Sequence, residues 1–164
     1  MTKANDTSAL ARRVVGMLGR YMKAQDDLFK PSMGKILRIP GLYKPVDYGE
    51  NLSSLKELKE ELLAIKADIR RQRPGEQPTS LEDRFLGVLR RYVSQMGDAV
   101  ERLASICRRL KVRSEGGAYD RREYKTDMTE LRDLQRKHLD TGVILNELVK
   151  ELERQESSGN EERD

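Results

Sequence analysis

The chain has 164 residues, of which 37% are charged and 37% hydrophobic, with 5% aromatic residues, no Trp and a net charge of +4. This balance is typical of long amphipathic helices with surface ion pairs and argues against β structure. No apolar run reaches the roughly 18 residues that a membrane span needs, so we expect a cytoplasmic protein without a membrane segment. A single cysteine, Cys107, excludes an intrachain disulfide.

The first two helices are predicted over residues 8–30 and 54–73. In the first, apolar residues recur near every 3.6 positions until Pro31, which cannot continue a helix. The second begins at a capping box, Ser54-x-x-Glu57, in which each side chain accepts the free backbone N–H of the other residue. Both helices are therefore expected to be close to 20 residues long.

The third helix is predicted over residues 80–114. It opens with a second capping box, Thr79-x-x-Glu82. Its apolar seam steps by four and three from Phe85 to Leu110, which is a sustained heptad pattern. This pattern predicts either a buried bundle helix or a coiled-coil interface.

The fourth helix is predicted over residues 120–156, after a tight reversal at Gly116-Gly117. Asp120 and Glu123 are expected to start it. Residues 157–164 are Ser, Gly, Asn, Glu, Arg and Asp, too polar to pack, and are expected to form a disordered tail.

These elements predict an all-α fold: one four-helix bundle-like domain over residues 1–156, with a long antiparallel hairpin of the third and fourth helices. A long ordered loop is expected between the first and second helices. Because the second helix is expected to be short, it should lie beside the first half of the third helix and leave the Gly116-Gly117 end less covered.

The loop at residues 31–50 supports two interpretations. Its apolar residues, among them Ile36 and Leu42, predict a strap packed across the third and fourth helices. Its basic residues alternate with these apolar residues and with Tyr43 and Tyr48, as a surface contacting a polyanion or partner would. The two roles are compatible.

Charge separates along the hairpin. Around the Gly116-Gly117 reversal, eight basic residues face three acidic ones, whereas residues 147–164 hold seven acidic and three basic residues. A basic end can bind nucleic-acid phosphates, and tyrosines can stack on unpaired bases. Two alternatives need no nucleic acid. The charged side chains can form an ordinary solvated surface, or the basic end of one copy can pack on the acidic end of another in a head-to-tail assembly. The predicted nucleic-acid-binding residues are Lys35, Arg38, Tyr43, Lys44, Arg108, Arg109, Lys111, Arg113, Tyr119, Arg121, Arg122 and Lys125.

Catalytic and metal-binding patterns are lacking. The one histidine, His138, falls on the apolar seam of the fourth helix beside Thr141, which predicts a buried polar layer. Its run shares Gly142 with histidine phosphotransfer domains but has Thr141 where those carry Lys, so core placement is preferred. No phosphate-binding glycine loop or Glu-x-x-His pair occurs. We therefore expect no enzyme activity, cofactor, metal or small-molecule substrate.

The sequence thus predicts a non-catalytic helical accessory subunit that binds nucleic-acid backbone at its basic end and a partner protein through the hairpin. The alternative is a protein-interaction or oligomerising scaffold module without nucleic-acid affinity, whose interface includes the seam from Phe85 to Leu110.

Overall fold

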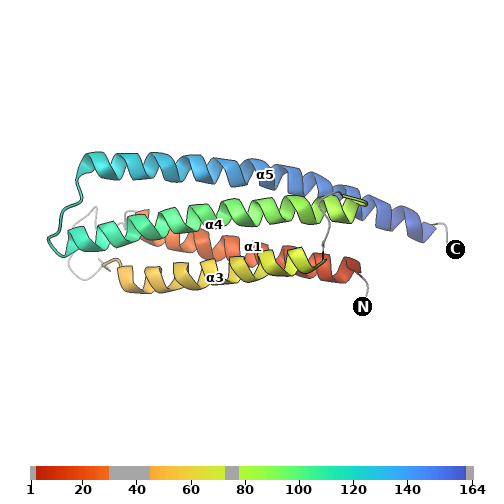
Figure 1. Cartoon of the computed structure of the whole chain (residues 1–164), viewed down its shortest axis with the longest axis horizontal. Coiled ribbons are helices and arrows are strands. Elements are labelled where there is room, and N and C mark those ends of the chain that lie inside the picture. Colours follow the sequence, from red (N-terminus) through yellow and green to blue (C-terminus); the bar gives the residue numbers. More distant parts are fainter. Residues whose placement is uncertain (1–2, 30–44, 73–77, 162–164) are drawn as a thin grey trace.

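The computed structural model describes residues 3–29, 45–72 and 78–161, and almost all of these residues lie in four helices (Figure 1). The helices are α1 (Lys3–Phe29), α3 (Tyr48–Gln72), α4 (Leu81–Ser114) and α5 (Arg121–Glu161). Within the described ranges there is no β-strand. The predicted all-α, bundle-like fold is confirmed.

Helix α4 is the centre of the arrangement. It packs against each of the other three helices, most extensively against α5 and α3, while α1 packs on α3 and α4. Helices α1 and α4 run in one direction and α3 and α5 in the other (Figure 1). No Cα atom in the described part of α1 lies within 8 Å of one in α5. These two helices are therefore neighbours through side chains alone.

The heptad seam of α4 forms the middle of the core. Every seam residue from Phe85 to Ile106 is buried, and Leu110 is partly buried. Each buried Leu, Ile or Phe contributes about 1.5–3 kcal/mol relative to exposure. The seam is thus used inside the bundle, and the expectation that it offers an exposed interface between copies is wrong.

Helix α3 begins six residues before the predicted Ser54 box. The Asp47 carboxylate accepts the backbone N–H of Glu50 at 2.8 Å, and the Asp47 carbonyl accepts that of Asn51 at 3.1 Å. Asp47 is therefore the N-cap. The helix has 25 residues, or about 37 Å.

This longer helix changes the covering of the hairpin. The thiol of Cys107 donates to the carbonyl oxygen of Tyr48 at 3.6 Å, so the start of α3 lies beside the last two turns of α4. The expectation that the second helix would reach only the first half of the third is wrong, whereas residues 111–118, next to the Gly116-Gly117 turn, are exposed, as expected for a less covered end.

The other helix starts differ less from the prediction. Helix α4 is capped by Ser80, whose hydroxyl accepts the Asp83 N–H at 3.0 Å, so the predicted Thr79-x-x-Glu82 box is displaced by one residue. At the start of α5 the predicted pair is confirmed. Asp120 and Glu123 each accept the backbone N–H of the other, at 2.8 and 2.9 Å.

Two further helices are longer than predicted. Helix α1 starts at Lys3 rather than residue 8, and α5 continues to Glu161. Residues 157–161 are thus helical, which corrects the predicted tail over residues 157–164, and residues 162–164 lie outside the described ranges. None of the described helical segments is long and apolar enough to cross a bilayer.

The reversal between α4 and α5 depends on its glycines. Gly116 has a φ of +88°, a region that side chains with a Cβ rarely adopt. The N–H of Gly117 donates to the carbonyl of Val112 at 2.8 Å, and a Cβ on Gly117 would clash with a Val112 methyl group. The sequence-based prediction of a tight turn at these two residues is confirmed.

Candidate binding surfaces

The hairpin tip, taken as residues 108–125, presents exposed basic side chains from the end of α4 and the start of α5. Arg108 pairs with Glu101 at 3.3 Å. Five other cations have no carboxylate oxygen within 4.0 Å among the described residues, and we call them the tip cations. They are Lys111, Arg113, Arg121, Arg122 and Lys125.

A buried carboxylate lies beneath this surface. Asp127 accepts the Tyr119 hydroxyl at 2.8 Å and the Arg109 guanidinium at 3.1 Å, with Arg102 at 3.5 Å. Burial raises the pKa of the Tyr119 hydroxyl most, and the hydrogen bond to Asp127 raises it further. Tyr119 is only 5% exposed, and the Arg109 guanidinium lies over its ring at 5.6 Å from the centroid. The structure therefore places these two predicted site residues in an internal network, where Tyr119 is closed to a base.

This network also changes the charge balance of the tip. Arg102 contacts both Asp127 and Glu130, and Arg108 contacts Glu101. These three acids were outside the sequence window used for the predicted balance. With them included, eight basic residues face six acidic ones, so the excess is smaller than the sequence indicated and rests on the tip cations.

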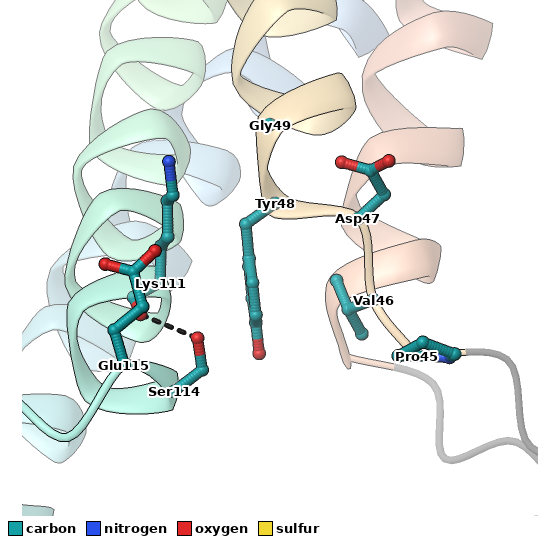
Figure 2. Close-up of a pocket in the computed structure, with 8 residues that line it drawn as sticks. All are labelled: Pro45, Val46, Asp47, Tyr48, Gly49, Lys111, Ser114 and Glu115. Carbon is teal, nitrogen blue, oxygen red and sulfur yellow. Dashed lines mark hydrogen bonds between the residues drawn. The ribbon is translucent and has the colours of Figure 1, made fainter.

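A groove of about 570 Å³ lies at the same end of the molecule, between the start of α3 and the last turn of α4. Figure 2 shows Tyr48 between Asp47 and Val46 on one side and Lys111, Ser114 and Glu115 on the other. The carboxylates of Asp47 and Glu115 offset the Lys111 charge, so the groove itself does not favour an anion.

Residues 45–49 of the predicted strap line this groove and thus lie beside the end of α4. The predicted site residues Lys35, Arg38, Tyr43 and Lys44 lie outside the described residues, as does the apolar part of the strap. Both interpretations of the strap stay predictions.

His138 is buried in the bundle, as its seam position predicted. Its ring is T-shaped to the rings of Tyr21 and Tyr92, with centroids 6.2 and 5.5 Å away. Its Nδ1 has no hydrogen-bond partner among the described residues, and burial lowers its pKa. Thr141 beside it bonds the Gln95 amide oxygen at 2.6 Å. A buried ring of this kind has no access to a phosphate donor.

No nucleophile or metal site emerges from the described residues. No group of three or more His, Cys, Asp or Glu side chains within them could hold a metal ion. Burial raises the pKa of Cys107 to about 11, so its thiol stays protonated near neutral pH.

Sequence reasoning missed a second surface, on α1 and α5. Large apolar side chains are exposed there, and two of them, Leu139 and Val143, fall off the buried seam of α5. Their signal in the sequence is that they stand one and two residues after seam positions His138 and Thr141. An apolar residue off the seam predicts exposure.

Searches of protein-family models, curated proteins and solved structures found no match to this chain. Functional conclusions therefore rest on the geometry of these two surfaces.

Proposed function

We propose that the protein is a non-catalytic helical accessory subunit that binds the phosphate backbone of nucleic acid through the tip cations. Lys and Arg gain affinity for nucleic acid by releasing its condensed counterions. Contacts of this kind position a protein on the backbone without reading sequence. Exposed cations spread over two helix ends suit an extended chain of phosphates better than one small anion.

The observation that carries the proposal is the position of Arg121 and Arg122. They occupy the first turn of α5, are exposed, and have no carboxylate oxygen within 4.0 Å in the described structure. The start of a helix carries partial positive charge, so each cation there costs about 0.3–1 kcal/mol. Lys111 and Arg113, in the last turn of α4, are stabilising instead. Helix stability therefore explains the α4 cations but not the α5 pair.

A matched pair of variants tests the proposal. Arg121→Glu/Arg122→Glu removes two of the three tip cations on α5, and Arg90→Glu/Arg91→Glu makes the same charge change at two exposed arginines of α4, about 30 Å away along the helix. Fluorescence anisotropy with labelled single-stranded RNA and duplex DNA measures affinity, and circular dichroism verifies folding. We expect at least a tenfold loss in the first variant and less than a threefold loss in the second. Equal losses, or no binding by the folded wild type, contradict the proposal.

The second candidate function is a protein-interaction module without nucleic-acid affinity. The exposed apolar side chains on α1 and α5 favour it, because apolar patches on a soluble surface mark interaction sites. This function is supported if wild-type protein binds neither nucleic acid at low salt but does bind a protein or peptide.

A further inference from the structure

Four basic side chains in the first half of α5 lie along one side of the helix. At about 100° per residue, Arg121, Lys125 and Arg132 fall within about 40° of one another, and Arg122 lies at the edge of the same side. All four are exposed, and none has a carboxylate oxygen within 4.0 Å among the described residues. We call these four residues the α5 stripe. It shares three residues with the tip cations and extends beyond the tip to Arg132.

The acidic residues of the same part of α5 lie on another side. Asp127 and Glu130 contact arginines of α4, and Glu123 accepts a backbone N–H at the helix start. At about 100° per residue these three acids lie about 140–160° from Lys125. Contacts with α4 and with the helix start thus occupy the acids, and the stripe keeps an unbalanced positive charge.

The stripe ends at Arg132. The next basic residue on this side, Arg136, is balanced by Asp133 at 3.7 Å, and residues 147–164 hold seven acidic and three basic residues. Arg121 and Arg132 are about 16 Å apart along the helix axis. The unbalanced charge therefore occupies one continuous segment of α5 next to the hairpin turn (Figure 1).

Helix stability does not explain this arrangement. Lys125 stands one turn after Arg121 and Arg122, and like charges at this spacing destabilise a helix. Arg132 has no acidic residue one turn before or after it either. The residues at those positions are Met128, Thr129, Gln135 and Arg136. A ligand of opposite charge would offset the repulsion within the stripe.

The aromatic residues beside the stripe offer no stacking platform. Tyr119 is 5% exposed and packs T-shaped against the half-buried Tyr124, with ring centroids 6.0 Å apart. No other aromatic side chain in residues 3–29, 45–72 and 78–161 is exposed, and Tyr43 lies outside these ranges. Proteins that bind single-stranded nucleic acid stack its bases on aromatic rings. A ligand whose bases are already stacked inside a double helix needs no such rings.

We propose that the protein binds double-stranded nucleic acid, with phosphates of one strand placed along the α5 stripe from the hairpin tip to Arg132. A double helix is stiff and presents its phosphates at regular intervals, which matches a row of cations fixed on one helix. The inference rests on the proposed function. It deepens that function by naming the form of the nucleic acid and by adding Arg132 to the residues that bind it.

Two ligands of equal charge test the form of the nucleic acid. A duplex of about 20 base pairs and an unstructured single strand of about 40 nucleotides carry about the same number of phosphates. In anisotropy titrations of the full-length protein, we expect the duplex to bind at least fivefold more tightly. Equal affinities, or tighter binding of the single strand, overturn the inference and leave nucleic-acid binding in place, whereas binding of neither contradicts the proposed function itself.

A matched pair of variants tests the path along α5. Arg132→Gln removes the end of the stripe, and Arg154→Gln makes the same change at an exposed arginine of α5 that also lacks a carboxylate oxygen within 4.0 Å in the described structure. Arg154 lies about 33 Å further along the helix. Circular dichroism verifies that both variants fold.

The salt dependence of duplex binding is the readout for this pair. Loss of one phosphate contact moves the slope of log Kobs against log salt concentration towards zero by about 0.9. We expect this change in Arg132→Gln and no change in Arg154→Gln. If Arg132→Gln keeps the wild-type slope while Arg121→Glu/Arg122→Glu weakens binding, the duplex contacts the tip without following α5, and the inference is overturned while the proposed function stands.

A second copy of the chain is another source of negative charge, because residues 147–164 are acidic overall. Light scattering at low salt separates this occupant from nucleic acid. Wild-type oligomers that Arg132→Gln dissociates and Arg154→Gln does not would show that the stripe packs on the acidic end of another copy, which overturns the inference. A wild type that stays monomeric and prefers the duplex supports it.

Discussion

Replacing Asp127 by Asn tests the buried network that supports the hairpin tip. Asn keeps the size of the side chain but loses its charge. The carboxylate has only 7% side-chain exposure and accepts Tyr119 at 2.8 Å and Arg109 at 3.1 Å. Arg102, at 3.5 Å, is at the limit of a hydrogen bond and adds little.

The magnitude follows from these two good hydrogen bonds. Each bond to a charged group contributes about 1.5–3 kcal/mol, but Arg109 is 46% exposed, so solvent screens its share. We expect Asp127→Asn to lower the free energy of unfolding by about 2–3 kcal/mol, or about 4–12 °C in Tm. Asp133→Asn, at an exposed carboxylate 3.7 Å from Arg136, should cost less than about 0.5 kcal/mol.

Urea unfolding followed by circular dichroism measures both variants. A double-mutant cycle with Tyr119→Phe isolates the hydrogen bond and should give a coupling of about 1.5 kcal/mol. A loss at Asp127 no greater than at Asp133, or additive effects at Tyr119 and Asp127, would refute the assignment of the network as a stabilising feature of the tip.

Four other substitutions or reactions carry defined expectations. Burial lowers the pKa of His138 in the folded chain. Near pH 6.5 the unfolded chain therefore binds a proton on this ring while the folded chain does not. The contribution of His138 to the free energy of unfolding is thus constant above about pH 6.5 and decreases below it. In His138→Gln the part of the decline below about pH 6.5 that His138 causes should disappear from urea midpoints, and an unchanged pH profile contradicts this. Cys107, with its pKa raised to about 11, should react with a thiol reagent near neutral pH only after unfolding, and rapid labelling of native protein would show that it is accessible. Gly117→Ala should cost about 1–3 kcal/mol because its Cβ would lie 2.9 Å from the Val112 carbonyl oxygen. Gly97 lies inside α4, and a Cβ added there would meet no atom within 4 Å, so Gly97→Ala should raise the free energy of unfolding by up to about 1 kcal/mol. Thermal melts measure both glycine variants. A Gly97→Ala variant less stable than Gly117→Ala would be inconsistent with the turn geometry.

The sequence predicted a helix correctly where its apolar repeat extends over many residues and where glycine or proline marks its end. The seam from Phe85 to Leu110 and the glycines at the turn determined α4 and the reversal after it. The start of α3 was missed because Ser54-x-x-Glu57 satisfied the same pattern as the true cap at Asp47, whose partner Glu50 has equivalent spacing. A capping pattern alone does not show which of two candidate residues starts the helix, because tertiary packing decides between them.

The site was less predictable, because charge balance depends on contacts between helices. A count over consecutive residues included the arginines of the tip but not Asp127, which neutralises Arg109 across 18 positions. A signal was available, since Asp127 stands four residues before Leu131 on the α5 seam. A carboxylate on an apolar seam predicts a buried partner, and Tyr119 and Arg109 are the partners found.

The salt dependence of nucleic-acid binding tests the central functional claim most directly. Each neutralised phosphate of duplex DNA contributes about −0.9 to the slope of log Kobs against log salt concentration. The five tip cations therefore predict a wild-type slope of about −2 to −4.5, and Arg121→Glu/Arg122→Glu should bring it closer to zero by about two. A wild-type slope near zero, or the same slope in that variant, would contradict the role of the hairpin tip.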